Sequence, residues 1–203
     1  MPRPSSRDSS RAQPNDRSRT GGRARSPAAS SSRPARAATT PASAKSAAGA
    51  SGPRHWLVKS EPACYSIDDL RRDGSTRWDG VRNHQARNFM RDQMRVGDLV
   101  LFYHSSAEPP GVAGVARIAR AAYPDDSAWD RRSDHFDARS TPERPVWVMV
   151  DLGFVEKFGR FVSLADLRAD PRLAGLLVLR PGQRLSVMPV EPAHFEIVRS
   201  IGR

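Results

Sequence analysis

The sequence has little of what proteins use for disulfide, metal or membrane structure. It contains one cysteine, Cys64, which excludes an intramolecular disulfide and a zinc site built from cysteines, and fits a reducing compartment. No stretch approaches the ~18 apolar residues that a membrane-spanning helix requires. The N-terminus lacks the apolar segment of a secretory signal peptide. We therefore expect no membrane association.

The first 53 residues lack nearly every residue type that forms a core. They contain no Val, Ile, Leu, Phe, Tyr, Trp or Cys, and ten Lys/Arg face only Asp8 and Asp16. Such a segment cannot bury enough apolar surface to offset its ordering entropy, so we predict a disordered tail over residues 1–53. Three interpretations stay open for it: a polybasic arm that attracts nucleic acid, an organelle transit peptide, or an extension without function. Its seven prolines argue against the amphipathic helix of a transit peptide.

The chain also lacks the common catalytic motifs. There is no P-loop, no G-x-G-x-x-G and no G-x-S-x-G, and Gly111–Gly114 is only a glycine-rich strand segment. The histidines do not have metal-ligand spacing, so we expect no catalytic residues, no metal and no cofactor. Cys64 could act as a nucleophile only beside a base such as His55 or His104, and a small half-buried cysteine is the simpler interpretation.

Residues 54–203 hold all 14 aromatic residues and have 23 basic against 20 acidic groups, which predicts one nearly neutral domain. Apolar runs predict strands over 56–58, 99–103, 112–122, 146–152, 154–162 and 184–190. Helix starts are predicted at Ser66, Asn83 and Ser163, with the second helix reaching about Met94. We expect loops over 74–80 and 124–145, a short helix or turn over 171–179, and a closing segment over 192–198. This pattern predicts an α+β fold, a small mixed barrel of five or six strands with short helices.

Several strand ends carry groups that suit a flat ligand, because a nucleobase needs π-faces for stacking and donors and acceptors for its edge. Lys59, Ser60 and Glu61 stand where the first strand stops, and Trp78 lies in a glycine-flanked loop. Alternation at the end of the strand predicted over 99–103 sends Phe102 and His104 to one face and Tyr103 to the other. Trp147 begins a later strand. Each has a structural alternative: Trp56, Phe102 and Trp147 as core, Tyr103 and His104 as packed rings, and Glu61 as the partner of an arginine.

The helix predicted after Asn83 has two possible uses. Arg87, Arg91 and Arg95 recur at helical spacing, which is typical of a solvated face and also suits a row of phosphate contacts. Asn83 is most simply an N-cap, although a helix N-terminus there would also attract an anion.

Four sequence blocks resemble the EVE domain, whose best-known eukaryotic branch is the thymocyte nuclear protein family. The blocks are WLVKSEP (56–62), WDGVRNHQARNFM (78–90), GDLVLFYHS (97–105) and WVMVD (147–151). The resemblance covers residues 55–199. It implies a PUA-like fold, a curved β-barrel with flanking helices, and a relationship to YTH domains, which hold a methylated adenine in an aromatic cage. EVE domains are associated with DNA bases modified at cytosine and with modified RNA, and no enzymatic activity is generally attributed to them.

The resemblance also implies roles for individual residues. Ser60 and Glu61 would contact the base edge, Trp78 would form one wall, and Tyr103–Ser105 would form another part of the pocket. The loop 136–140 resembles a loop that often reads Tyr-Asp-Pro-Lys-Ser, so Phe136 lacks a tyrosine hydroxyl that could bind the ligand. The expected base-binding residues are Lys59, Ser60, Glu61, Trp78, Val81, Asn83, Asn88, Tyr103, His104, Ser105, Phe136 and Trp147. The expected contacts to the nucleic-acid backbone are Arg82, Arg87, Arg91 and Arg139.

Three functions follow as hypotheses. The first is a monomeric, non-enzymatic reader that holds a modified base, a modified cytosine in DNA, in an aromatic pocket. The second is an RNA-binding module acting on tRNA or rRNA. The third is a nucleotide or base hydrolase with Glu61 or His104 as general base. We expect a cytoplasmic protein of the bacterial type, or a nuclear one if the source is eukaryotic.

Overall fold

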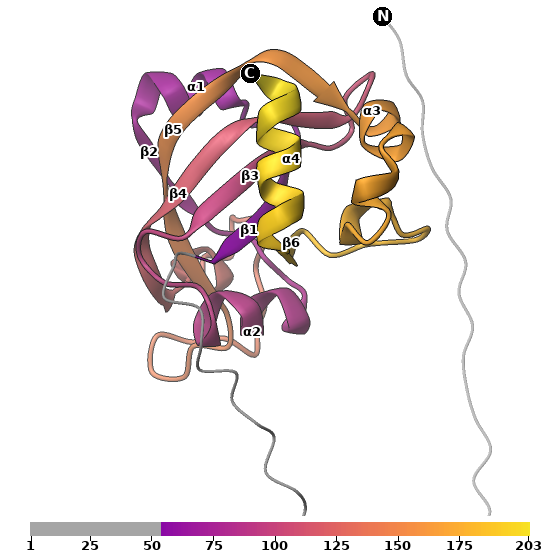
Figure 1. The fold of residues 1–203 in the computed structure, drawn as a ribbon. Coiled ribbons are helices and arrows are strands. Elements are labelled where there is room, and N and C mark those ends of the chain that lie inside the picture. The colour runs from indigo at the N-terminus through magenta and orange to yellow at the C-terminus, as the bar shows by residue number, and fades with distance from the viewer. Residues whose placement is uncertain (1–53) are drawn as a thin grey trace, which may run out of the picture. The chain divides into compact units, whose positions relative to one another are not determined.

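A computed structural model of the chain describes residues 54–203 (Figure 1). The prediction of a disordered tail over residues 1–53 lies outside the described residues. The described part is a six-stranded mixed sheet with four short α-helices and three 3-10 turns. It confirms the predicted α+β class with five or six strands. None of its helices is both long and apolar enough to cross a membrane.

The sheet has the strand order β2-β5-β4-β3-β1-β6. β1 runs parallel to β3, and every other neighbouring pair is antiparallel. The sheet curves strongly in Figure 1 but is not closed, because β2 and β6 are its edges. The strands are β1 (His55–Ser60), β2 (Ser75–Trp78), β3 (Leu99–His104), β4 (Gly111–Pro124), β5 (Val148–Ser163) and β6 (Val187–Val190).

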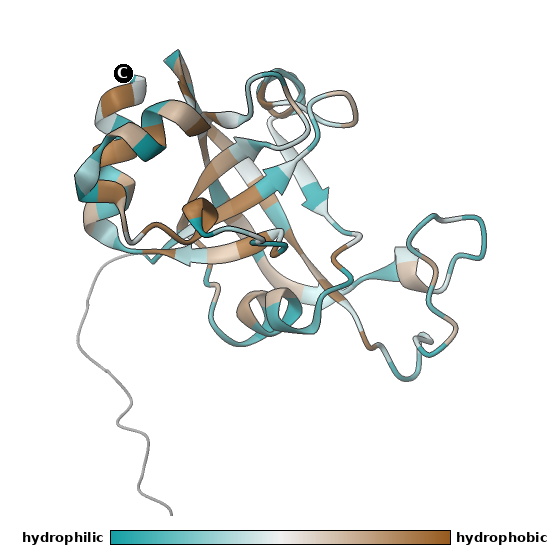
Figure 2. Ribbon diagram, turned by 90° about the vertical axis from the view of Figure 1, so that its right-hand side faces the viewer, coloured by the Kyte–Doolittle hydropathy of each residue, from teal (hydrophilic) through white to brown (hydrophobic). Residues whose placement is uncertain are grey.

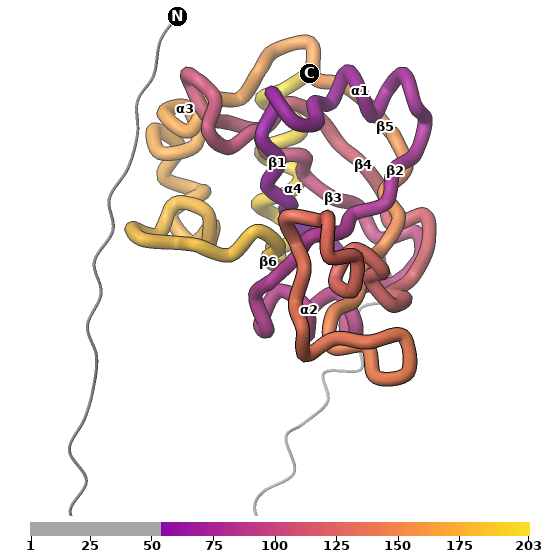
Figure 3. The backbone as a smooth tube through the Cα atoms, turned by 180° about the vertical axis from the view of Figure 1, so that it is seen from behind, coloured from indigo at the N-terminus to yellow at the C-terminus, as the bar shows by residue number. Residues whose placement is uncertain are grey.

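The four helices cover the sheet and one of its ends. α1 (Ile67–Asp73) contacts β2 and β5, and α4 (Pro192–Gly202) contacts β4 and β5. Figure 3, seen from behind, has α1 on the near side and α4 behind the strands. α2 (His84–Asp92) lies at one end of the sheet, and α3 (Leu164–Ala169) follows β5 directly. The 3-10 turns are η1 (Asp126–Ala128), η2 (Pro171–Leu173) and η3 (Leu177–Leu179).

The predicted helix starts are confirmed by their caps. Ser66 and Ser163 each form a capping box, with Asp69 and Asp166 respectively. The Asn83 side chain accepts hydrogen bonds from the amides of Gln85 and Ala86. In each case a short polar side chain satisfies amides that the first helical turn leaves free.

Two expectations about elements are wrong in detail, and a third segment had no predicted element type. The segment 74–80 is not wholly a loop, because Ser75–Trp78 pairs with Val150–Gly153 as the edge strand β2. The two strands expected over 146–162 are one strand, β5, which bends at several register shifts against β4 and so needs no break. The closing segment is the helix α4, whose Phe195 and Val198 are buried at helical spacing.

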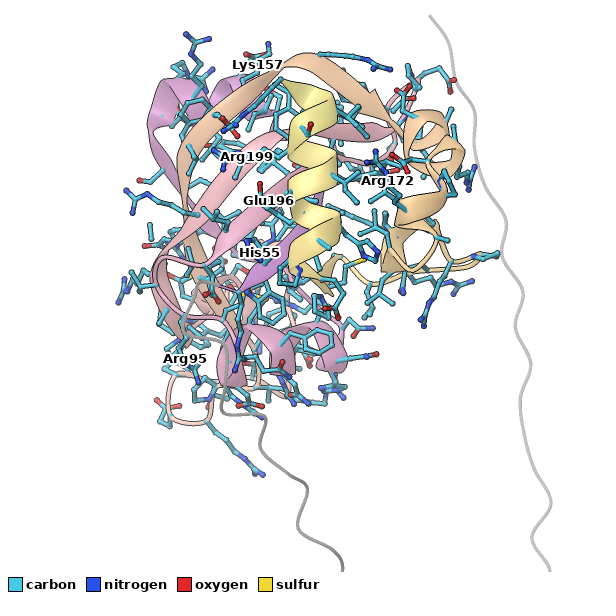
Figure 4. The ribbon with its side chains drawn as sticks, viewed as in Figure 1. His55, Arg95, Lys157, Arg172, Glu196 and Arg199 are labelled. Carbon is cyan, nitrogen blue, oxygen red and sulfur yellow. The ribbon has the colours of Figure 1, made fainter. Side chains whose placement is uncertain are left out.

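The core is continuous between the sheet and its helices. The largest fully buried side chains include Trp56, Phe102, Trp147 and Phe195. Trp56 and Phe102 belong to the apolar core cluster, which confirms the core alternative for these two, whereas Trp147 is buried outside that cluster. The Trp56 indole donates a 2.9 Å hydrogen bond to the carboxylate of Asp98. Burying a large apolar side chain contributes about 1.5–3 kcal/mol, so these rings fix the positions of β1 and β3. Arg199, labelled in Figure 4, ties α4 to β5 through a 2.5 Å bond to Glu156.

Candidate nucleic-acid interface

One cavity of about 740 Å³ opens where β1 ends. β1 and the edge strand β2 form its walls, and the turn between β1 and α1 and the loop after β4 complete it. In Figure 3 these segments lie on the same side of the domain. The volume falls within the ~300–1,000 Å³ typical of small-ligand sites. The lining residues are Lys59, Ser60, Glu61, Cys64, Tyr65, Ser75, Thr76, Arg77, Trp78, Asp79 and His135.

The adjacent ends of the parallel strands β1 and β3 are held together by serines. The Ser105 amide and hydroxyl both donate to the Ser60 carbonyl, at 2.7 and 3.1 Å. The Ser60 hydroxyl donates to the Tyr65 carbonyl at 2.5 Å, which closes the turn after β1. The Ser106 hydroxyl donates to Glu61 Oε1 at 3.2 Å, leaving the exposed Glu61 carboxylate beside the cavity. The serines therefore shape this end of the cavity.

Trp78 forms an aromatic part of the cavity wall. The sequence left a core role and a ligand role open for Trp78. In the structure the ring packs on the core and also lines the cavity. Its edge meets the buried ring of Phe102 at 5.6 Å between centroids, and the ring is half-buried. Phe102 fixes the orientation of the indole, while the indole still lines the cavity.

Lys59 is the basic residue at the strand end. Its ammonium donates to the Gln183 carbonyl at 3.0 Å, and burial lowers its pKa. A partly buried ammonium of this kind is a donor for carbonyl or phosphate oxygens.

Tyr103 and His104 lie outside the cavity lining. Tyr103 is buried on the other face of β3. His104 Nε2 accepts a 3.1 Å hydrogen bond from the Ile67 amide at the start of α1, so this nitrogen is occupied. Burial lowers the pKa of His104, which favours the neutral ring that this bond requires. Both side chains are therefore engaged within the fold: Tyr103 by packing and His104 by its bond to α1.

The loop after β4, residues 125–147, is held against the cavity by a buried carboxylate. Asp125 accepts hydrogen bonds from the Gly80 amide at 3.0 Å and from Arg82 at 2.7 Å. Burial alone would raise the Asp125 pKa, but bonds from Ser127 and Arg82 outweigh it and hold the pKa below its ordinary value. Arg82 also donates to the His135 carbonyl at 2.7 Å.

His135 lies directly against Gly80. A Cβ atom at Gly80 would come within 2.6 Å of the His135 ring, and the φ of Gly80 is +70°. This backbone conformation favours glycine, and a larger residue would also displace the exposed His135 ring. The loop thus places His135 beside Asp79 in the cavity lining.

Trp147 anchors the far end of the same loop. Its indole donates to Asp137 at 2.8 Å, its ring stacks on His84 at 4.8 Å, and Arg82 and Arg87 lie over it. Bonds from Arg139 and from the Trp147 indole hold the Asp137 pKa well below its usual range. Trp147 is 2% exposed and lies outside the cavity lining.

The four arginines expected at the nucleic-acid backbone are all bonded within the domain. Arg82 is bonded to the loop as described, and Arg87 donates to Asn88 and to the Val146 carbonyl. Arg91 pairs with Asp92, and Arg139 with Asp137. Of the other expected base contacts, Val81 is buried, Asn83 caps α2, and Phe136 is 39% exposed but outside the cavity lining.

The structure therefore brings together Lys59, Ser60, Glu61 and Trp78. Sequence reasoning assigned no binding role to the other lining residues, which are Cys64, Tyr65, Ser75, Thr76, Arg77, Asp79 and His135. The alternation of Ser75–Trp78 could have indicated a strand at this site, but its glycine flanks indicated a loop. Between residues 54 and 203 no group of three or more potential metal ligands is present.

Comparison with known proteins places this geometry in a family. Human thymocyte nuclear protein 1 is 41% identical over 165 residues, covering 72% of this chain and 73% of its own. A crystal structure from Pseudomonas syringae is 45% identical, with a TM-score of 0.71, covering 73% of this chain and 99% of that one.

A crystal structure of human thymocyte nuclear protein 1 in complex with 5-methylcytosine-containing DNA is also similar. It is 39% identical with a TM-score of 0.68, covering 73% of this chain and 97% of that one. The sequence profile of the EVE domain matches residues 54–201. The chain therefore belongs to the EVE domain family, and its fold is the PUA-like fold of that family.

Proposed function

We propose that this protein is a non-enzymatic reader of DNA that carries a modified cytosine, and that the modified base enters the cavity at the end of β1. The observation that carries the proposal is the half-buried Trp78 in the cavity wall, held by Phe102, within a family whose human member was crystallised with 5-methylcytosine-containing DNA. A stacking wall is what a flat ligand needs.

The polar lining matches the edge of a cytosine. A carboxylate is the usual acceptor for the cytosine N4 amino group, and Glu61 and Asp79 both line the cavity. The Thr76 hydroxyl and the Lys59 ammonium lie in the same lining and are donors suited to O2 and N3. A base that has left its stack exposes this whole edge together with both ring faces.

The positions of the candidate general bases favour binding over catalysis. His104 lies outside the cavity lining, and its Nε2 already accepts a hydrogen bond. Glu61 is exposed at the cavity and has the neighbouring Ser106 hydroxyl as its partner. A general base must reach the proton that it removes. Of the two candidates only Glu61 lines the cavity, so the hydrolase alternative depends on Glu61 alone.

The test is fluorescence anisotropy of the full chain with oligonucleotides that differ only in the modification. We expect tighter binding to 5-methylcytosine DNA than to unmodified DNA. Trp78→Ala should weaken that binding by about 1–3 kcal/mol, because it removes the stacking face. Phe161→Ala is the matched control, since Phe161 is an aromatic residue 36% exposed outside the cavity lining.

Equal binding of modified and unmodified DNA, with no effect of Trp78→Ala, would contradict the proposal. RNA oligonucleotides of the same sequence form a second arm, and preferential binding to RNA would replace the DNA reader by the RNA-binding alternative. Mass spectrometry of modified nucleotides after incubation with the protein forms the third arm, in which turnover would indicate the hydrolase.

A further inference from the structure

A second hollow adjoins the cavity at the end of β1. It measures about 470 Å³ and is formed by β2 and by the start of the 125–147 loop. Arg77 and Asp79 line both spaces, so the two are neighbours. We call the second hollow the Trp129 groove; its lining residues are Arg77, Asp79, Asp126, Ser127, Trp129, Asp130 and Ser133.

Trp129 differs from the other three tryptophans of the domain. Trp56 and Trp147 are buried, with their indole nitrogens bonded to carboxylates. Trp78 packs on Phe102. Trp129 is half-buried, and among residues 54–203 its ring belongs to no apolar core cluster, pairs with no other ring and donates no indole hydrogen bond. A large, partly exposed ring outside the apolar core and beside a hollow is typical of a binding surface.

The backbone beneath Trp129 is nevertheless fixed. The Asp125 side chain caps η1 by accepting from the Ser127 amide at 3.0 Å, and Ala128 is fully buried. The Ala128 carbonyl accepts from the Asp137 amide at 2.8 Å, and the Trp129 amide donates to the Asp126 carbonyl at 3.3 Å. The ring therefore stands on an ordered support, which lowers the entropy cost of using it to bind a ligand.

Arg77 stands at the junction of the two hollows. Its Nη2 bonds to Asp126 and to Met149 Sδ. Nε and Nη1 have no hydrogen-bond partner in the part of the chain that the structure describes, and half of the side chain is exposed. Two free donors at the boundary suit the oxygens of a phosphate that joins two nucleotides.

We propose that the Trp129 groove holds the nucleotide next to the modified one, with its base stacked on Trp129 and the linking phosphate at Arg77. This assignment rests on the proposed function, because it extends the same site. Asp126 and Asp130 are paired with Arg77 Nη2 and Arg132, and Asp79 adds a further carboxylate to the lining, so the groove itself favours a base over a phosphate. The ligand is thus a stretch of at least two consecutive nucleotides unpaired from a complementary strand.

Two ligands separate this proposal from the proposed function. One is the nucleoside 5-methyldeoxycytidine, which fills only the cavity at the end of β1. The other is a single-stranded trinucleotide with 5-methylcytosine at its centre. Binding of both to the full chain is measured by NMR titration, alongside a thermal melt that checks the fold of each variant.

Trp129→Ala should weaken binding of the trinucleotide by about 5- to 150-fold, as the loss of one base–aromatic stack predicts. The same variant should bind the nucleoside as the wild type does, and Trp129→Phe should retain most of the trinucleotide affinity. Trp78→Ala should weaken the binding of both ligands. Arg77→Gln should reduce the salt dependence of trinucleotide binding by about 0.7 in the log–log slope, which corresponds to one phosphate contact on a single strand.

Trinucleotide binding unchanged in Trp129→Ala, with wild-type binding intact, would overturn the Trp129 groove and leave the proposed function standing. Weaker binding of both the nucleoside and the trinucleotide to Trp129→Ala would also overturn the Trp129 groove, because Trp129 would then affect the cavity at the end of β1. Failure of the wild type to bind either modified ligand would overturn both proposals.

Discussion

The carboxylate of Asp125 and the guanidinium of Arg82 lie 2.7 Å apart, and the Asp125 side chain has no exposed surface. This pair joins the loop after β4 to the segment that leads from β2 into α2. The Gly80 amide donates to the same carboxylate at 3.0 Å. One buried charge therefore anchors the start of the 125–147 loop, while Trp147 anchors its far end.

Asp125→Asn should lower the free energy of unfolding by about 2–3 kcal/mol. The amide keeps the shape of the side chain, but it loses a charge-assisted bond and sets an NH2 group against donors that need an acceptor. Urea denaturation at neutral pH measures the loss. Asp130→Asn is the matched control, since Asp130 pairs with the exposed Arg132, and its effect should stay within about 0.5 kcal/mol. Equal effects of the two substitutions would refute the anchoring role.

The half-buried imidazole of His104 should make the domain less stable in mild acid. Burial lowers its pKa below the ordinary value of 6.5. The Asp68 carboxylate partly offsets this shift, and the Lys157 ammonium adds to it. The unfolded chain then binds the proton more readily, so stability is full above that ordinary value and falls as the pH drops through it. Carboxylates with lowered pKa values lose their contribution only at more acidic pH, outside this window.

His104→Gln separates this effect from others, because the glutamine oxygen can still accept the bond from the Ile67 amide. Urea midpoints at about pH 7.5 and about pH 5 bracket the ordinary histidine pKa. The wild type should lose more stability between them than the variant does. A small loss should remain in the variant, because burial also lowers the pKa of His55. An identical pH dependence in both proteins would show that His104 does not titrate with unfolding.

Gly114→Ala should destabilise the sheet by about 1–3 kcal/mol, in the range of overpacked cores. A Cβ atom there would meet the Glu156 carbonyl at 2.3 Å, where β4 and β5 change register, and Ile67 at 3.0 Å. Gly159→Ala on β5 is the control, because its nearest contact would be 3.5 Å away. Thermal unfolding of both variants checks the difference, and a melting temperature for Gly114→Ala equal to that of the control would disprove the close approach.

Much of the fold was predictable because local signals agreed with tertiary packing. Two kinds of signal were local: the helix caps at Ser66, Asn83 and Ser163, and the apolar runs of β1, β3 and β4. Each is visible within a few consecutive residues of the sequence. β2 was missed because its pairing partner, β5, lies about seventy residues away and its flanking glycines favour a turn. The helix α4 begins with Pro192, and no capping side chain marks its start.

The candidate site was predictable only in part, for a related reason. Lys59, Ser60, Glu61 and Trp78 belong to short blocks that resemble the family. Arg77 precedes Trp78 on β2 and was missed together with that strand. His135 joins the cavity through the path of the 125–147 loop, which no short segment encodes. The partners of the arginines were also hidden, although Asp92 follows Arg91 and Asp137 precedes Arg139 by two residues.

This pairing of arginines with nearby aspartates bears on how the proposed reader would search DNA. At Arg91, Arg132, Arg139 and Arg172 (the last labelled in Figure 4) the partner carboxylate lies within two residues along the chain. From a distance each such pair is a dipole and not a charge, and Figure 2 shows the hydrophilic loops that carry two of them projecting from the domain. Attraction to unmodified DNA grows with the number of phosphates neutralised, so the described domain would dwell briefly on ordinary sites. The abundant unmodified sequence would then compete weakly, and occupancy would follow the rare modified base more closely than the local DNA concentration.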